Sequence, residues 1–265
     1  MKYFDYTATT QIDEEVLDTY INTSRKFFAN STSLHRLGEE SNHMYEICKA
    51  GILNTLNSKT HNAIFVSNAT EANNIAILGE VRKHKKGRII TTITEHPSVY
   101  NCIKSLEKEY DVKYIDIKSD GSLNYDELEC EMNEDTILVS VMWVNNIIGT
   151  INDIKKVIDI VKRYPKCKLH VDGVQGLCKV NMDFDINDID LFTISAHKIY
   201  GPKGIGCLLF KNNMNLLPLL YGSNNQYKLK PGTLDVSLIA SFYKAIKKYY
   251  PLIDENQCIF GLRKT

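Results

Sequence analysis

The stretch LFTISAHKIYGPKGIGCLLF, residues 191–210, decides how the chain folds. Two apolar, β-rich runs, Leu191 to Ser195 and Gly204 to Phe210, flank a turn that holds Lys198 and is rich in glycine. The connection between them is too short for a crossover helix. We therefore expect the two runs to pair directly, with one of them antiparallel to its neighbours.

Upstream of this stretch, short β-rich runs alternate with segments of helical periodicity. The β-rich runs are Ala63 to Val66, Arg88 to Ile93, Val112 to Asp116, Thr136 to Trp143 and Lys168 to Asp172. The helical segments are Glu71 to Val81, Ser98 to Glu109, Asp153 to Arg163 and Leu238 to Tyr250, and two more helices open the chain. This alternation predicts an α/β fold with a mainly parallel, seven-stranded sheet that has helices on both faces.

The composition excludes several classes of function. The 265 residues include 32 Lys plus Arg against 32 Asp plus Glu, so no net charge draws the chain to nucleic acid or to anionic membranes. No run of eighteen apolar residues occurs, and the opening MKYFDY does not resemble a signal peptide. The seven cysteines form no CxxC pair, which is typical of free thiols. We expect a cytoplasmic protein whose function lies in a local site.

In an open parallel sheet, ligands bind beyond the carboxyl ends of the strands. The segment SNATE, residues 67–71, follows one strand and opens a helix, so its free backbone N–H groups could seat an anion. The alternative is a simple helix N-cap by Asn68 or Thr70.

Three further strand ends carry reactive side chains. His96 could stack on a ligand or be structural, and Asp172, with Gln175 nearby, could pair with a cation or cap a helix. Lys198 could form a Schiff base with an aldehyde or be a solvated turn lysine. Pyridoxal phosphate requires four such groups: an anion-binding helix start, an aromatic side chain that stacks on its ring, a carboxylate and a lysine.

The same motifs resemble those of a known family from Tyr3 to about Tyr250. The chain is similar to the class V aminotransferases of fold type I and, within them, to cysteine desulfurases of the NifS/IscS type. The resemblance rests on YFDYTATT at residues 3–10, NSTSLHRLG at 30–38, SNATEANN at 67–74, TEHPSV at 94–99, VNNIIGT at 144–150, HVDGVQ at 170–175, SAHKIYGPKGIG at 195–206 and PGTLDV at 231–236.

The resemblance implies a role for each site residue. Lys198 would bond to pyridoxal 5'-phosphate and move protons as a catalytic base, with His96 as the second catalytic residue, stacked on the ring. Asp172 would pair with the ring nitrogen and Gln175 with the phenolic oxygen. The phosphate would be held by Thr70, the N–H of Ala69, Ser195 and His197, with Thr233 serving the partner subunit of a homodimer, while Asn146 would lie beside cofactor and substrate.

The implied reaction removes sulfur from L-cysteine, giving L-alanine and a protein persulfide for iron–sulfur clusters or thio-cofactors, handed to a sulfur-acceptor or scaffold protein. Two alternatives remain open: a sibling such as a selenocysteine lyase, and a PLP-binding homologue that does not turn over. A nicotinamide-binding Rossmann domain is disfavoured because no GxGxxG follows the first strand.

The sequence departs from the family in two motifs and at its carboxyl end. Ile147 stands where relatives carry an acidic residue, and GSNNQYKLKPGT at 222–233 has lysines where relatives have an arginine, which binds anions by a bidentate fork. We expect residues 1–15 to belong to a small domain, 16–250 to form the large cofactor-binding domain, and 251–265 to begin a truncated small domain. The nucleophilic cysteine and the substrate-binding arginine would follow this segment, and Cys258 and Arg263 are weak substitutes for them.

Overall fold

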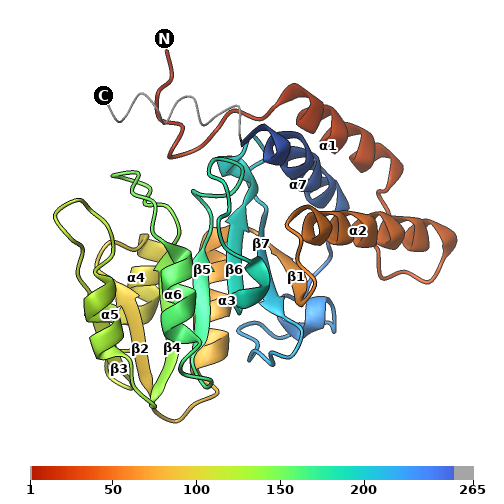
Figure 1. Cartoon of the computed structure of the whole chain (residues 1–265). Helices are drawn as coiled ribbons and strands as arrows, with labels where there is room; N and C mark the ends of the chain where they lie inside the picture. The colour runs from red at the N-terminus through yellow and green to blue at the C-terminus, as the bar shows by residue number, and fades with distance from the viewer. Residues whose placement is uncertain (1, 254–265) are drawn as a thin grey trace.

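The computed structural model describes residues 2–253 and contains the predicted seven-stranded sheet (Figure 1). The order across the sheet is β1-β7-β6-β5-β4-β2-β3, and β7 runs antiparallel to both β1 and β6 while the other neighbours are parallel. The mainly parallel sheet and the short antiparallel connection are thus confirmed. The strands are β1 (His61–Val66), β2 (Arg88–Thr92), β3 (Asp111–Ile115), β4 (Thr136–Met142), β5 (Lys168–Asp172), β6 (Leu191–Ser195) and β7 (Gly206–Lys211).

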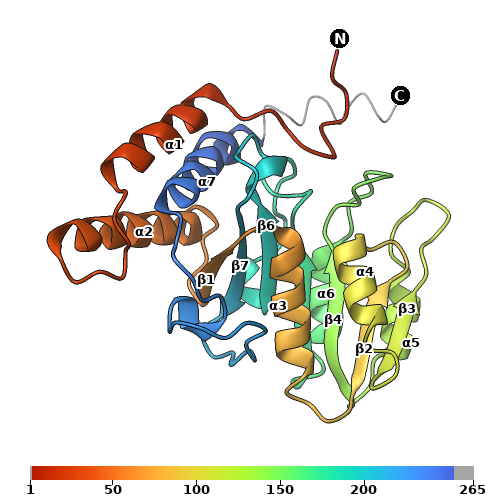
Figure 2. The same ribbon diagram turned by 180° about the vertical axis from the view of Figure 1, so that it is seen from behind.

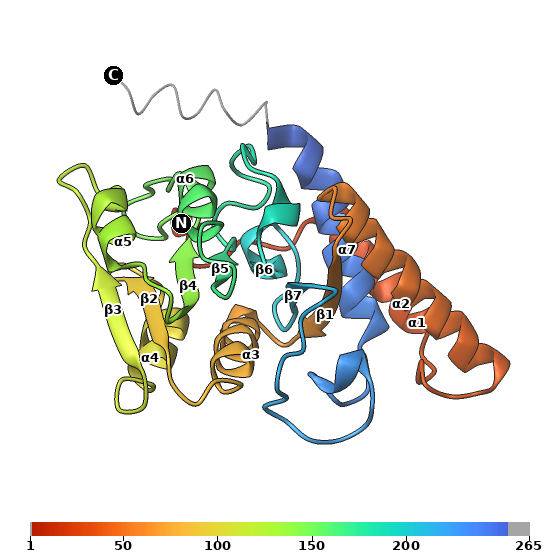
Figure 3. The ribbon, with the colours of Figure 1, turned by 60° about the horizontal axis from the view of Figure 1, so that its bottom comes forward.

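Helices cover both faces of the sheet. Figure 2 shows α3 and α4 on one face, whereas α5 and α6 lie on the other, and Figure 3 shows α1, α2 and α7 gathered beside β1 and β7. The helices are α1 (Glu14–Lys26), α2 (Arg36–Thr55), α3 (Ala69–Val81), α4 (Pro97–Lys104), α5 (Tyr125–Glu131), α6 (Ile154–Val161) and α7 (Val236–Tyr249).

Two hydrophobic cores, one on each face, hold the layers together. In β1, Ala63 and Phe65 join the core that contains α1, α2, α6 and α7, whereas Ile64 and Val66 join the core under α3. This split follows from the strand geometry, since successive side chains point to opposite faces. A strand buried on both sides therefore reads as a continuous apolar run, which is why the sequence located the strands well.

The predicted elements differ from the observed ones mainly at their ends. The helix expected over residues 98–109 ends at Lys104, and turns follow it. Ser105 Oγ donates to the carbonyl of Cys102 at 2.7 Å, a local bond that competes with helix continuation. The strand expected from Gly204 begins at Gly206, because Gly204 has a φ of +85° and belongs to the turn. The short helix α5 was not predicted.

The domain boundaries at residues 15 and 250 stay predictions. Residues 2–13 precede α1 and contact the turn that carries Lys198, and α7 continues into a short helical turn, Tyr250–Leu252. Cys258 and Arg263 lie outside the described residues. Within residues 2–253 no helix is long and apolar enough to cross a membrane.

Candidate active site

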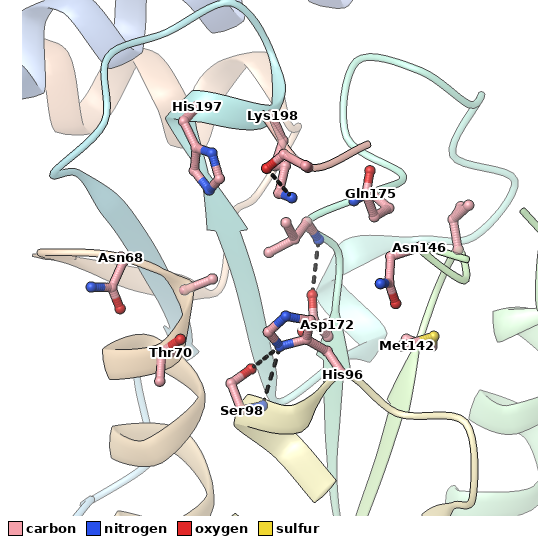
Figure 4. Close-up of a pocket in the computed structure, with 14 residues that line it drawn as sticks. Asn68, Thr70, His96, Ser98, Met142, Asn146, Asp172, Gln175, His197 and Lys198 are labelled. Atoms are coloured by element: carbon pink, nitrogen blue, oxygen red, sulfur yellow. Dashed lines mark hydrogen bonds between the residues drawn. The ribbon is translucent and has the colours of Figure 1, made fainter. Parts of the chain in front are cut away.

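A cavity of about 250 Å³ opens where the parallel strands end at their carboxyl termini (Figure 4). We call it the Lys198 cavity. Eight of the ten predicted site residues line it, and they come from five segments far apart in the sequence. They are Ala69, Thr70, His96, Asn146, Asp172, Gln175, His197 and Lys198, and the other lining residues are Ala8, Asn68, Ser98, Met142, Val144 and Val174.

The predicted anion seat is the first turn of α3. Asn68 Oδ1 accepts the N–H of Glu71 at 2.9 Å, so Asn68 is the N-cap, and Ala69 and Thr70 line the cavity beside it. The segment is therefore capped by Asn68, and the same helix start still faces the cavity where an anion could bind. A Cβ on Gly206 would lie 3.2 Å from the nitrogen of Ala69, so this glycine permits the close approach of β7 to the helix start.

Ser195 lies beneath this seat. It is the last residue of β6 and pairs in register with Gly206, and its side chain is buried. Its Oγ has no hydrogen-bond partner among residues 2–253, which is costly for a buried hydroxyl. Ser195 does not line the open cavity, so its predicted contact with a phosphate stays a prediction, but its free donor fits an anion held at the helix start.

Asp172 is the buried carboxylate of the cavity. Its Oδ1 accepts the N–H of Val174 at 3.0 Å, and its Oδ2 accepts Asn73 Nδ2 at 2.9 Å. A series of turns follows rather than a helix, so the helix-cap alternative is wrong. Burial raises the pKa of Asp172, although these hydrogen bonds and the nearby His96 and Lys198 oppose the change. A buried carboxylate of this kind favours a cationic partner.

Asn73 and Ser98 connect Asp172 to His96. Asn73 Nδ2 donates to Ser98 Oγ at 2.9 Å as well as to Asp172, and Ser98 Oγ lies 2.7 Å from His96 Nδ1. His96 Nδ1 also accepts the N–H of Ser98 at 3.1 Å, which leaves Nε2 as the protonated nitrogen. Burial and the charge of Lys198 lower the pKa of His96, against the effect of Asp172, which favours the neutral ring. The sequence prediction missed Asn73, although an asparagine within the apolar helix α3 signals a buried polar contact.

Lys198 is half-buried and points into the cavity, which favours a ligand-binding lysine over a solvated turn lysine (Figure 4). Its Nζ donates to the carbonyls of Thr7 and Ala8, at 2.6 Å and 2.8 Å. Burial lowers the pKa of Lys198, an effect that the more distant carboxylates of Asp172 and Asp5 oppose. A lowered amine pKa makes the neutral, nucleophilic form more accessible.

Thr10 fixes the turn on both sides of Lys198. Its N–H and its Oγ1 each lie 2.9 Å from the carbonyl of His197 and donate to it, and its Oγ1 accepts the N–H of Tyr200 at 2.7 Å. Tyr200 has a φ of +61°, a strained conformation that such bonds must hold. The motif ATT is visible in the sequence, but this role of Thr10 was not predicted.

Thr233 does not line the Lys198 cavity. It is exposed and lies in a separate groove, the Thr233 groove, where Lys230 pairs with Glu71 at 3.1 Å. Its predicted action on a partner subunit stays a prediction. Ile147, the departure noted at the mouth of the site, leaves 85% of its side chain exposed. The remaining residues of the groove are Phe65, Val66, Ser67, Gly204, Ile205, Gln226, Pro231, Gly232, Leu234, Asp235, Leu238 and Ile239.

The chemistry of the cavity fits pyridoxal phosphate. A helix start and a buried unpartnered hydroxyl suit its phosphate, a desolvated carboxylate suits its protonated ring nitrogen, and a lysine of lowered pKa suits its aldehyde. Within residues 2–253, no cluster of three or more His, Cys, Asp or Glu side chains could hold a metal ion. The fold and cavity therefore define a pyridoxal-phosphate-dependent α/β protein.

Comparison with known proteins agrees. Residues 2–250 match the family model for aminotransferase class V, and the chain belongs to this family, whose cofactor is pyridoxal phosphate. A NifS/IcsS protein homolog of Lactobacillus delbrueckii subsp. bulgaricus is 37% identical over 97% of this chain and 67% of its own length. Cysteine desulfurase IscS 1 of Archaeoglobus fulgidus is 35% identical over 92% of this chain and 64% of its own length.

Solved structures give the same fold. A NifS-like protein superposes with a TM-score of 0.91 at 33% identity, over 96% of this chain and 70% of that one. A structure described as SspA in complex with cysteine gives a TM-score of 0.88 at 32% identity, over 94% of this chain and 73% of that one. The chain therefore spans about two thirds of the length of such relatives.

Proposed function

We propose that this chain carries the cofactor-binding site of a cysteine desulfurase that removes sulfur from L-cysteine and yields L-alanine. The observation that carries the proposal is the convergence of Lys198, Asp172 and His96 on one cavity whose other wall is the start of α3. The relatives named cysteine desulfurase and the structure of a similar protein with cysteine support the choice of substrate.

The roles of the side chains follow from their surroundings. When bound, pyridoxal phosphate supplies an aldehyde for the amine and a ring that withdraws electrons. Asp172 would hold a proton at the ring nitrogen, because its carboxylate is buried and held by Asn73. His96 lines the same cavity and is linked to Asp172 through Ser98 and Asn73, and its lowered pKa favours a neutral ring that could stack. Lys198 Nζ takes and returns the substrate proton, because its lowered pKa lets the amine act as a base.

The Lys198 cavity contains no thiol from residues 2–253 that could accept sulfur. No cysteine within residues 2–253 lines it, and Cys130, on α5, is the exposed thiol of that part of the chain. We propose that a thiolate outside the described residues attacks the substrate sulfur. Iron–sulfur cluster or thio-cofactor synthesis, through an acceptor or scaffold protein, is the proposed destination of the persulfide.

We also propose a cytoplasmic homodimer. The Thr233 groove supports this, since an exposed threonine and glycine lie beside Lys230 without facing the cavity of their own chain. Sedimentation of the cofactor-loaded chain should give a dimer. A stable monomer that keeps its cofactor would contradict this part of the proposal.

The test of the proposed function begins with visible absorption of the purified chain after addition of pyridoxal phosphate. We expect a band that depends on Lys198 and changes when L-cysteine is added, followed by alanine release in the presence of a reductant. Selenide release without sulfide release would instead favour the selenocysteine lyase alternative. A band without any alanine release would favour a cofactor-binding homologue that does not turn over.

A further inference from the structure

A second lysine, Lys179, lies behind the Lys198 cavity. It is half-buried, and its Nζ donates to Gln175 Oε1 at 2.7 Å. Burial, followed by the charge of Lys198, lowers the pKa of Lys179 to about 8. No carboxylate within residues 2–253 forms an ion pair with it. A cation without a carboxylate partner is costly in a partly buried position, so its hydrogen-bond acceptor among the described residues, Gln175, indicates the role of the amine.

The contact with Lys179 determines which way the amide of Gln175 points. An ammonium group has three donors and no acceptor, so the atom that faces Lys179 must be the amide oxygen. The amide nitrogen then faces the opposite way, and Nε2 indeed donates to the carbonyl of Thr7 at 2.8 Å. Two independent contacts thus require the same orientation.

Gln175 lines the cavity, whereas Lys179 does not. The carbonyl of Thr7 accepts from both Gln175 Nε2 and Lys198 Nζ, so the amide nitrogen lies close to the reactive amine. Apart from the effect of its charge on Lys198 and His197, Lys179 can therefore influence a bound group through Gln175. Without it, the amide could rotate and turn its oxygen toward the cavity, where it would repel an anionic oxygen.

We propose that Lys179 is a positioning residue that holds the Gln175 amide with its N–H donors toward the cavity, so that they can bind an oxygen atom of the cofactor. This inference rests on the proposed binding of pyridoxal phosphate. It assigns the specific orientation of Gln175 to a residue that contacts neither cofactor nor substrate.

The test is a double-mutant cycle read from the pH midpoint of the visible band in the cofactor-loaded chain. Lys179→Met and Gln175→Leu should each raise the midpoint by roughly half a pH unit or more. Each change removes hydrogen-bond donors that favour the deprotonated form of the bound cofactor, which gives the band. In the Gln175→Leu background, Lys179→Met should add less than half of its single effect. Lys203→Met, which changes an exposed lysine of the neighbouring turn, is the matched control and should leave the midpoint unchanged.

The outcomes separate this inference from the proposed function. If the wild-type chain gives no Lys198-dependent band, the proposed function fails and this inference falls with it. If the band forms and the two shifts are additive, Lys179 acts on its own and the inference alone is overturned. Should Lys179→Met not fold, Lys179→Gln keeps a neutral donor for Gln175. Its midpoint should stay near that of the wild type, and a shift as large as that of Gln175→Leu would overturn the inference.

Discussion

The Lys198 cavity and the Thr233 groove both contain residues of family motifs, but they are built in opposite ways. The cavity gathers side chains from the ends of β2, β5 and β6, and its central carboxylate is buried and hydrogen-bonded on both oxygens. In the groove, Thr233 is exposed and its side chain makes no hydrogen bond within residues 2–253. Within residues 2–253 the groups of the first site are thus held by their own chain, whereas the proposed partner of Thr233 would lie on another.

This difference shows what fixes the positions of the side chains in each site. Groups at the ends of adjacent parallel strands are held by the sheet, so their relative positions are fixed by the strand register. Thr233 lies on an exposed loop without such support, so its proposed contact would need a second surface to pack on it. Variants of the two sites can test whether one chain holds the cofactor in the cavity and whether Thr233 acts only on a partner chain.

The largest effect is expected from Lys198→Ala. Loss of the amine should abolish covalent attachment of the cofactor, measured as the mass added after borohydride reduction, and should lower turnover by about 10²- to 10⁴-fold or more. Lys203→Ala, an exposed lysine of the same turn, is the control and should keep the added mass. Attachment that persists in Lys198→Ala would move the covalent site elsewhere.

Asp172→Asn should come next. The amide can still accept the N–H of Val174, but it loses the charge that pairs with a ring nitrogen, so turnover should fall roughly 10²- to 10³-fold. The control is Asp190→Asn, a buried carboxylate at the other end of β6 that pairs with Lys211. That change should lower stability and leave the cofactor spectrum intact. Equal spectral effects of the two changes would argue against the assigned role of Asp172.

Glu95, buried behind Asp172, predicts a pH dependence of stability. Its Oε1 accepts from Thr92 and from the N–H of Met142, and its Oε2 has no partner in the described part of the chain. Burial raises its pKa from 4.5 to about 8. The native state then holds a proton that the unfolded chain loses, so the free energy of unfolding should decrease as pH rises from about 4.5 to 8.

Glu95→Gln should remove this pH-dependent decrease in the free energy of unfolding. The decrease is on the order of a few kcal/mol, because each pKa unit corresponds to about 1.4 kcal/mol. Chemical unfolding at pH 6 and pH 9 measures it. Glu129→Gln, at an exposed position, should behave like the wild type at both values. The same pH dependence in wild type and Glu95→Gln would show that Glu95 is not the responsible group.

Thr10→Val should have a smaller effect. The change keeps the shape but removes the hydroxyl that bonds His197 and Tyr200, so the free energy of unfolding should fall by about 1–2 kcal/mol and cofactor attachment should slow. Thr19→Val, whose hydroxyl bonds only the α1 backbone, is the control. If attachment is unchanged while stability falls, Thr10 supports the fold but not the position of Lys198.

The smallest effect is expected from Thr233→Ala, which tests the groove. Loss of one hydrogen bond to the phosphate should weaken cofactor affinity about 5- to 10-fold. In a mixed dimer with Lys198→Ala, the chain that keeps Lys198 receives an intact Thr233 from its partner, so affinity at that site should recover. Affinity that stays low in the mixed dimer would place Thr233 in the site of its own chain.

The sequence by itself determined the α/β class, the seven strands and most cavity residues, because buried strands appear as apolar runs and ligand-binding residues follow their carboxyl ends. Lys198 and Asp172 could be identified in this way. The ends of α4 and β7 could not, since they depend on a side-chain bond of Ser105 and on the conformation of Gly204.

Only the tertiary structure decided how these residues are held. Thr10 bonds the turn of Lys198 across 187 residues of sequence, and Asn73 reaches Asp172 across 99. The orientation of the Gln175 amide rests on two contacts, with Lys179 at 2.7 Å and with the carbonyl of Thr7 at 2.8 Å. A sequence pattern predicts which strand ends meet, because topology brings them together. It does not predict hydrogen-bond partners, because these depend on distances of a few tenths of an ångström that appear only when the chain is packed.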